Sequence, residues 1–231
     1  MTDIHTHILP CIDDGSKSAS ESAEMLRLLS EQGVTTVCAT PHFYPNVTDP
    51  ARFLEQRGKS LQMLSDHLGS APVPRIVPGA EVSYYEGITH LSCIRDLCIG
   101  DTGILLLEMP GVHWSERMLR DLRELTEDQG LTVVLAHIER FLTMQPRKLW
   151  AELHRSGILF QVNASFFIAR RTQLLAVHML KKGLIDLIGS DCHNTGRRPP
   201  ELGSAYAVIE KRFGSAFTQT LIKAQDDLFA I

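Results

Sequence analysis

Two histidines and three aspartates lie close together near the start of the chain, in the segment DIHTHILPCIDDG. His5 and His7 are two residues apart, so on a β-strand their side chains would point to the same face. Asp13 and Asp14 follow at a turn that ends in Gly15. Imidazoles and carboxylates together suit divalent Mn, Fe or Zn. The segment could therefore be the first half of a metal site, although a purely structural turn would also explain the aspartates.

Nearly every other apolar, β-branched run of the sequence also ends near a histidine or a carboxylate. Strands are predicted at 3–5, 34–40, 75–82, 104–108, 131–137, 158–163 and 184–190. The polar residues at or just beyond their ends are His42, Glu81, Glu108, His137, Asp191 and His193. Each residue alone is better explained as a turn or loop residue, but the repeated placement needs a common cause.

The stretches between the strands predict helices and a repeated strand–helix unit. Ser18 with Glu21, and Ser115, are placed as helix amino-terminal caps. A glycine follows each of four helical stretches directly before a strand, at 33, 130, 157 and 183. We therefore expect one α/β domain over residues 1–231, as a closed or nearly closed parallel barrel, with a doubly wound open sheet as the alternative.

In a parallel barrel, the carboxyl ends of the strands meet at one rim, where the active sites of such folds lie. Buried histidines and carboxylates gathered there would be costly unless a cation neutralised them. The sequence therefore predicts a divalent metal centre at this rim.

Composition and charge exclude several other classes of protein. The net charge of −4 argues against a general nucleic-acid binder, and no apolar run approaches the roughly 20 residues of a membrane-spanning helix. We see no secretory signal. Five cysteines without a Cys-x-x-Cys pair do not suggest a disulfide framework, so we expect a cytoplasmic protein.

The segments DIHTHILPCIDDG, ATPHF, GAEV, LLLEMP, LAHIERF and GSDCHNTGRRPP resemble, in set and order, the polymerase-and-histidinol-phosphatase (PHP) superfamily. They are most similar to the bacterial metal-dependent protein-tyrosine phosphatases of capsule and exopolysaccharide operons. The resemblance implies a distorted (β/α)7 PHP-type barrel that holds three divalent ions, with Mn²⁺ expected and Fe or Zn as alternatives. The implied metal ligands are His5, His7, Asp14, His42, Glu81, Glu108, His137, Asp191 and His193.

The same resemblance assigns phosphate binding to Arg140 and Arg198, with Arg197 as a neighbour that could share this role. Cys11 stands where related sequences usually carry Gly, and Phe141 where a Tyr is common. The first difference concerns the shape of the loop rather than the ligand set.

The implied reaction is hydrolysis of phosphotyrosine in a protein by direct attack of a metal-bridging hydroxide. Asp14 or His42 would supply a proton to the leaving group. The implied partner is a bacterial tyrosine autokinase of polysaccharide synthesis and export, and the oligomeric state stays open.

Three other interpretations compete with this one. The segment from Cys192 to Arg198 fits Cys-x5-Arg, the loop of cysteine-dependent phosphatases, which would make Cys192 the nucleophile. A PHP-type small-molecule phosphatase, acting on histidinol phosphate or a similar phosphomonoester, would use the same metal site. A non-enzymatic docking module would hold the metals only as structural ions.

Overall fold

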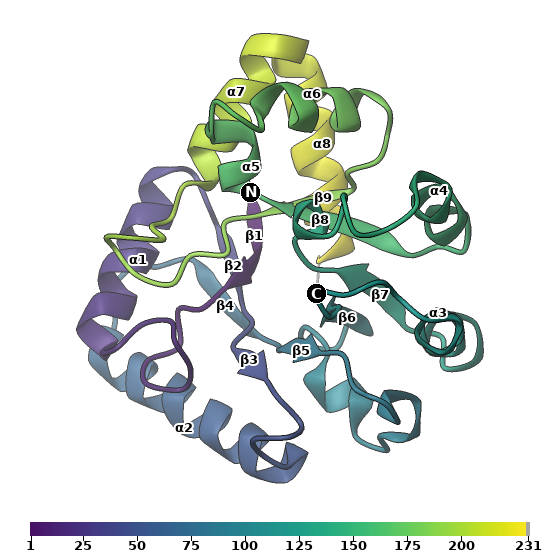
Figure 1. Ribbon diagram of the computed structural model, residues 1–231. Coiled ribbons are helices and arrows are strands. Elements are labelled where there is room, and N and C mark those ends of the chain that lie inside the picture. Colours follow the sequence, from purple (N-terminus) through teal and green to yellow (C-terminus); the bar gives the residue numbers. More distant parts are fainter. Residues whose placement is uncertain (230–231) are drawn as a thin grey trace.

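Short parallel strands alternate with helices along the chain in the computed structural model, which describes residues 1–229 (Figure 1). The strands are β1 (Thr2–Thr6), β2 (Thr36–Ala39), β3 (His42–Phe43), β4 (Arg75–Pro78), β5 (Glu81–Ser83), β6 (Ile104–Glu108), β7 (Thr132–Leu135), β8 (Leu159–Asn163) and β9 (Leu187–Gly189). The α-helices are α1 (Ala19–Glu31), α2 (Pro50–Leu68), α3 (Glu116–Arg123), α4 (Arg147–Arg155), α5 (Ala164–Ile168), α6 (Gln173–Lys181), α7 (Leu202–Phe213) and α8 (Ser215–Leu228). Single helical turns are η1 (Ile88–His90), η2 (Ile94–Leu97), η3 (Glu124–Asp128) and η4 (Ile138–Arg140).

The strands curl into a barrel, and the helices lie around its outside (Figure 1). One ladder runs β1-β2-β4 and the other β3-β5-β6-β7-β8-β9, all parallel. A bridge between Thr6 and Cys192 joins β1 to the segment after β9. If β2/β3 and β4/β5 each count as one interrupted strand, the sheet has seven positions and closes. The seven-stranded barrel is therefore confirmed, and the doubly wound open sheet is wrong.

The predicted single strand at 75–82 is in fact two strands, and that prediction was wrong. Gly79 and Ala80 interrupt it, and the chain passes close to Ile99 there. A Cβ on Gly79 would lie only 3.2 Å from the Ile99 Cα. The backbone N–H of Glu81 then donates to the Pro41 carbonyl at 3.0 Å, so pairing with the neighbouring strand resumes beyond the break as β3 with β5. The two-residue β3 was not predicted.

The helix starts follow the predicted caps with one change. The Ser18 hydroxyl accepts from the Glu21 N–H at 3.1 Å, and Ser115 accepts from Met118 in the same way. The carboxylate of Glu21, however, accepts from the Lys17 N–H at 2.8 Å rather than from the cap residue itself. The four predicted glycines after helices all adopt a left-handed backbone, with φ between 64° and 82°.

Inside the barrel, one end is filled by a small apolar cluster that is separate from the main core outside the sheet. This inner cluster consists of Ile4, Cys38, Val77, Ile99, Ile104, Leu106, Val134, Ala136, Leu187 and Phe229. Because side chains two apart share a face, Glu108 points to the same side of β6 as Ile104 and Leu106, into the barrel. The apolar cluster therefore forms a floor, and the polar site lies above it.

Candidate metal centre

The carboxyl ends of the strands bring all the predicted ligand residues into one site. His5 lies on β1, His42 on β3, Glu81 on β5 and Glu108 on β6. His7 and Asp14 follow β1, His137 follows β7, and Asp191 and His193 follow β9. Except for Asp14, His42 and Glu108, these residues are buried.

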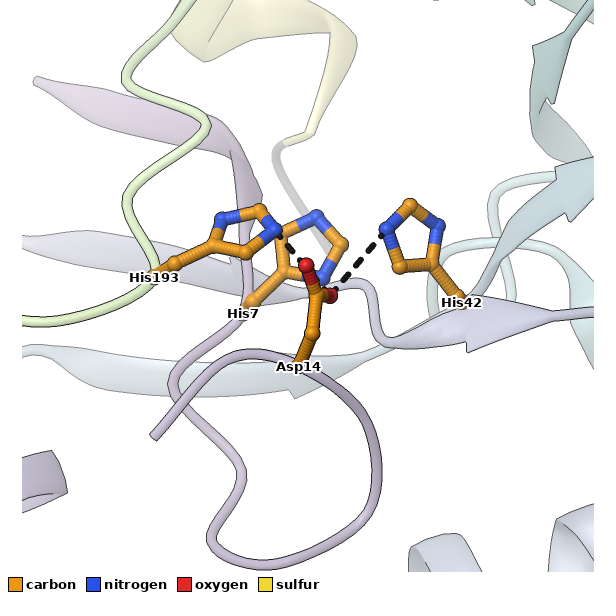
Figure 2. A group of neighbouring side chains, drawn as sticks. All are labelled: His7, Asp14, His42 and His193. Carbon is orange, nitrogen blue, oxygen red and sulfur yellow. Dashed lines mark ion pairs between the residues drawn. The ribbon is translucent and has the colours of Figure 1, made fainter. Parts of the chain in front are cut away.

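Three groups of these side chains have ligand atoms close enough to hold one ion each. The groups are His7–Asp14–His42–His193, His5–His7–Glu81 and His42–Glu81–Glu108, and within each group the ligand atoms lie within 4.8 Å of one another. Figure 2 shows the first group, in which the Asp14 carboxylate lies between two imidazoles. Its Oδ1 is 3.5 Å from His42 Nε2 and 3.4 Å from His193 Nε2.

The two remaining predicted ligands border the same groups. His137 Nε2 is 2.7 Å from Glu81 Oε1 and 3.3 Å from Glu108 Oε1. Asp191 Oδ1 is 3.5 Å from His5 Nε2 and 3.3 Å from His7 Nε2. The structure therefore brings together all nine residues and leaves none of them outside the site.

Charges of both signs stabilise each other in this buried site. Burial alone would raise the pKa of the Glu81 carboxyl, but His5 and hydrogen bonds from His137 and His42 hold it well below its usual value. Burial alone would lower the pKa of His7, but hydrogen bonds to Asp13, Asp191 and Glu81 raise it well above 6.5. In the absence of a metal, protonated His5 and His7 thus offset the carboxylate charge, whereas burial lowers the pKa of His137 and brings that of His193 to about 4.

The donor atoms fit divalent cations. Glu81 Oε2 is buried and lies 2.9 Å from His42 Nδ1, 3.2 Å from His5 Nε2 and 3.3 Å from His7 Nε2. The Nε2 atoms of His5 and His7 are only 3.2 Å apart. Ligand atoms that converge this closely in a buried site are costly unless a cation binds them, so the arrangement matches a site built for ions. Mixed imidazole and carboxylate ligands suit Mn, Fe or Zn.

Two of the site residues have a strained backbone. His137 has φ of 34° and Asp191 has φ of 53°, a region that non-glycine residues seldom adopt. Such strain is common at functional sites, where the surrounding structure has to maintain it. Gly189 has no side chain, and this allows His5 to pack closely against it, because a Cβ at Gly189 would lie 2.7 Å from the Cβ of His5.

Two of the three arginines considered from the sequence reach this site. Arg140 Nη2 donates to Asp191 Oδ2 at 2.9 Å, and Arg198 Nη2 donates to the same oxygen at 2.5 Å. Both side chains keep solvent contact, with exposed fractions of 42% and 39%. Arg197 is exposed, and the hydrogen bond found for it is the one its backbone N–H donates to Asn194 Oδ1.

The structure contradicts a role for Cys192 as nucleophile. Its side chain is fully buried, and burial raises the pKa of the thiol well above its usual value. A thiolate nucleophile needs the opposite conditions, namely access and a lowered pKa.

The sequence assigned Asp13 only to a turn and gave no role to Gln161 or Asn163, yet all three contact the ligands. Asp13 Oδ2 accepts from His7 Nδ1 at 2.7 Å and from the His42 N–H at 3.0 Å. These hydrogen bonds outweigh the effect of burial and lower the pKa of Asp13 to about 2. Gln161 and Asn163 contact the ligands from β8. Their place at the end of a predicted strand was a signal, but amides are ordinary buried residues and do not by themselves mark a metal site.

A cavity of about 460 Å³ opens beside the metal centre. Asp14 and His42 form one of its walls, and Tyr44, Val47 and Arg52 also line it. The Tyr44 ring stacks on His42, with ring centroids 5.0 Å apart, and is 37% exposed. The site can thus accommodate a group attached to whatever binds at the metals.

Comparisons with known proteins agree with this geometry. A family model described as capsular polysaccharide synthesis, CpsB/CapC, matches residues 1–227. The tyrosine-protein phosphatase YwqE of Bacillus subtilis is 30% identical over 93% of this chain and 86% of its own. The tyrosine-protein phosphatase CpsB of Streptococcus pneumoniae is 29% identical over 93% of this chain and 92% of its own. A crystal structure from work on these two proteins, described as unique metal-dependent tyrosine phosphatases, superposes with a TM-score of 0.83 at 27% identity and covers 97% of this chain and 93% of its own.

Proposed function

The chain belongs to the CpsB/CapC family of capsular polysaccharide synthesis, and from this membership together with the site we propose that it is a metal-dependent tyrosine-protein phosphatase. The observation that carries the proposal is the convergence of nine histidine and carboxylate side chains beside Arg140 and Arg198. Two similar proteins that span nearly the whole chain are named tyrosine-protein phosphatases.

We propose that the nine residues hold three divalent ions, with Mn²⁺ as the expected metal. When bound, such ions supply a hydroxide near neutral pH and neutralise charge on the phosphoryl oxygens. The four ligands in Figure 2 would surround one ion, and the groups around Glu81 would hold the others. His7, His42 and Glu81 would each contribute to more than one ion, since they belong to more than one group.

Arg140 and Arg198 would bind the non-bridging oxygens of the phosphate. A guanidinium group matches the geometry of a phosphate with two parallel hydrogen bonds. Both arginines now donate to Asp191, which places their side chains directly beside the ligand cluster. Asp14, whose side chain is 67% exposed, and His42 lie between the ligand cluster and the cavity. Either could pass a proton to the leaving phenolate, which needs modest help because the pKa of tyrosine is about 10.

The cavity beside Tyr44 would accept the phenyl ring of the phosphotyrosine. Of the aromatic residues near the motifs, Phe43 is buried against Phe53, and Tyr84 is buried and donates to Asp121 at 2.6 Å. Tyr44 therefore supports the ring proposal best.

The physiological substrate would be the phosphorylated tail of a bacterial tyrosine autokinase, and the site of action the cytoplasm. Family membership supports this substrate. Within residues 1–229, no helix is long and apolar enough to cross a membrane. The five cysteines are all free, as a reducing compartment favours. We expect the whole chain to act as one metallophosphatase domain.

The test combines metal removal with a choice of substrates. Chelation should abolish hydrolysis of a phosphotyrosine peptide, added Mn²⁺ should restore it, and Cys192→Ser should retain the activity. Histidinol phosphate should be a poor substrate under the same conditions. Full activity of the metal-free protein, or loss of activity in Cys192→Ser with normal folding, would refute the proposal.

A further inference from the structure

The strand β8 contributes none of the nine proposed ligands, yet it passes directly beneath them. The side chains of Gln161 and Asn163 point to the same face of this strand and are both buried. A buried amide is costly unless its donors and acceptors are paired. The partners of these two amides are therefore informative about their role.

Gln161 contacts two of the proposed ligands from below. Its Oε1 accepts from the His137 N–H at 2.7 Å and lies 3.3 Å from His5 Nδ1. An acceptor at this position favours the His5 tautomer that carries its proton on Nδ1. The lone pair of Nε2 then points toward His7 and Glu81, where an ion would lie.

Asn163 continues the same chain of hydrogen bonds to a third ligand. Its Oδ1 accepts from Gln161 Nε2 at 3.0 Å, and its Nδ2 donates to Asp191 Oδ2 at 2.7 Å. Its backbone N–H donates to Glu139 Oε1 at 3.1 Å, which ties β8 to η4, the turn that carries Arg140. Since donors and acceptors alternate along the chain, each amide has one favourable orientation.

We propose that Gln161 and Asn163 are positioning residues that hold His5, His137 and Asp191 in the orientation that binds metal. This inference rests on the proposed metal centre and adds an amide layer between the apolar floor of the barrel and the ligands. Partners behind the direct ligands typically change metal affinity or activity by about 10- to 100-fold when removed.

A buried glutamine elsewhere in the chain provides a matched control. Gln225 on α8 links β1 to β9 through its side-chain amide. Its Nε2 donates to the Thr2 and Ile188 carbonyls, and its Oε1 accepts from the Ile188 N–H. It is as buried as Gln161 but contacts none of the nine ligands. Replacing either glutamine by leucine removes the same chemical group, so only an effect on the ligands should separate them.

The experiment compares Gln161→Leu, Asn163→Ala and Gln225→Leu in the full-length chain. Mn²⁺ binding is measured by calorimetry, Co²⁺ absorption reports ligand geometry, and Tm is measured without metal. We expect Gln161→Leu and Asn163→Ala to weaken Mn²⁺ binding about 10- to 100-fold and to change the Co²⁺ spectrum. Gln225→Leu should lower Tm while its Mn²⁺ affinity and Co²⁺ spectrum stay those of the wild type.

Equal Mn²⁺ affinity in all folded variants would overturn the positioning role and leave the metal centre intact. If Gln161→Leu does not fold, Asn163→Ala alone decides, since it shortens a side chain at the end of the strand. Wild-type protein that binds neither Mn²⁺ nor Co²⁺ would overturn the metal centre, and the positioning role with it.

Discussion

At the scale of single residues, the site depends on neighbours that fix the orientation of each charged side chain. Asp13 accepts from His7 Nδ1, which turns Nε2 toward the shared site. Asn194 Oδ1 accepts from the backbone N–H groups of Gly196, Arg197 and Arg198, and so shapes the turn that carries Arg198. Hydrogen bonds from such neighbours fix the orientation of these side chains, which their charge alone would not determine.

Adjacent arginines allow a direct test of phosphate binding. Arg198 reaches Asp191 and His193, whereas the Arg197 side chain is exposed. Arg198→Lys removes the planar fork but keeps the charge, so kcat/KM for a phosphotyrosine peptide, measured at saturating Mn²⁺, should fall by about 10-fold or more. Arg197→Lys is the control and should stay within about twofold of the wild type. Equal losses in the two variants would contradict the assignment.

At the scale of secondary structure, the carboxyl ends of the strands determine which side chains come together in the barrel. Histidines and carboxylates at strand ends were predictable because their chemistry is distinctive and parallel strands align their carboxyl ends. Gln161 and Asn163 were not, because amides are ordinary buried residues and their contacts are distant in sequence; Gln161 and His5 are 156 residues apart. The break at Gly79 was also missed, since it depends on packing against Ile99.

The loop after β1 shows how a departure from a family pattern can be accommodated. Cys11, at the position where the family resemblance leads us to expect Gly, has φ of 60°. Glycine adopts this backbone most easily. The Cys11 N–H donates to the Ser16 carbonyl at 2.9 Å, and its thiol donates to the Lys17 carbonyl at 2.9 Å. These bonds hold the loop that carries Asp13 and Asp14 despite the missing glycine.

The close approach of β9 to β1 makes Gly189 a sensitive position. A methyl group at Gly189 would lie 2.7 Å from His5 Cβ and 3.3 Å from the His5 backbone nitrogen, so β1 would have to shift. Gly189→Ala should therefore destabilise the protein by about 1–3 kcal/mol and weaken Mn²⁺ binding. Both are measured by denaturant unfolding and calorimetry.

Gly58 offers the matched control for this substitution. It lies within α2, where nothing is within 4 Å of an added Cβ. Gly58→Ala should stabilise the protein by about 0.5–1 kcal/mol and leave metal binding unchanged. Unchanged stability and metal affinity in Gly189→Ala would show that β1 and β9 do not constrain His5.

At the scale of the whole molecule, the barrel is built in layers along its axis. An apolar floor closes one end, the amides of β8 lie above it, and the ligands and arginines lie at the rim. The charged groups are thus held by the closed sheet. Without metal, protonated His5 and His7 offset the carboxylates of the site. Glu81 and Asp191 outweigh burial and raise the pKa of His5, and Asp13, Asp191 and Glu81 do the same for His7.

This balance predicts that metal binding releases protons. A histidine binds metal through a deprotonated nitrogen, and the pKa of His7 lies well above 6.5 in the metal-free protein. Metal affinity should therefore rise with pH as this proton is lost. Calorimetry in two buffers of different ionisation enthalpy should detect proton release at pH 7. Identical apparent enthalpies in both buffers would contradict this account of the metal-free site.

The most direct test of the central claim is anomalous diffraction from crystals of the protein grown with Mn²⁺ and soaked in phosphate. We expect manganese peaks enclosed by the nine histidine and carboxylate side chains, with phosphate bound between those peaks and the guanidinium groups of Arg140 and Arg198. Crystals that show Mn²⁺ elsewhere, or no anomalous peak among these ligands at saturating metal, would contradict the claim.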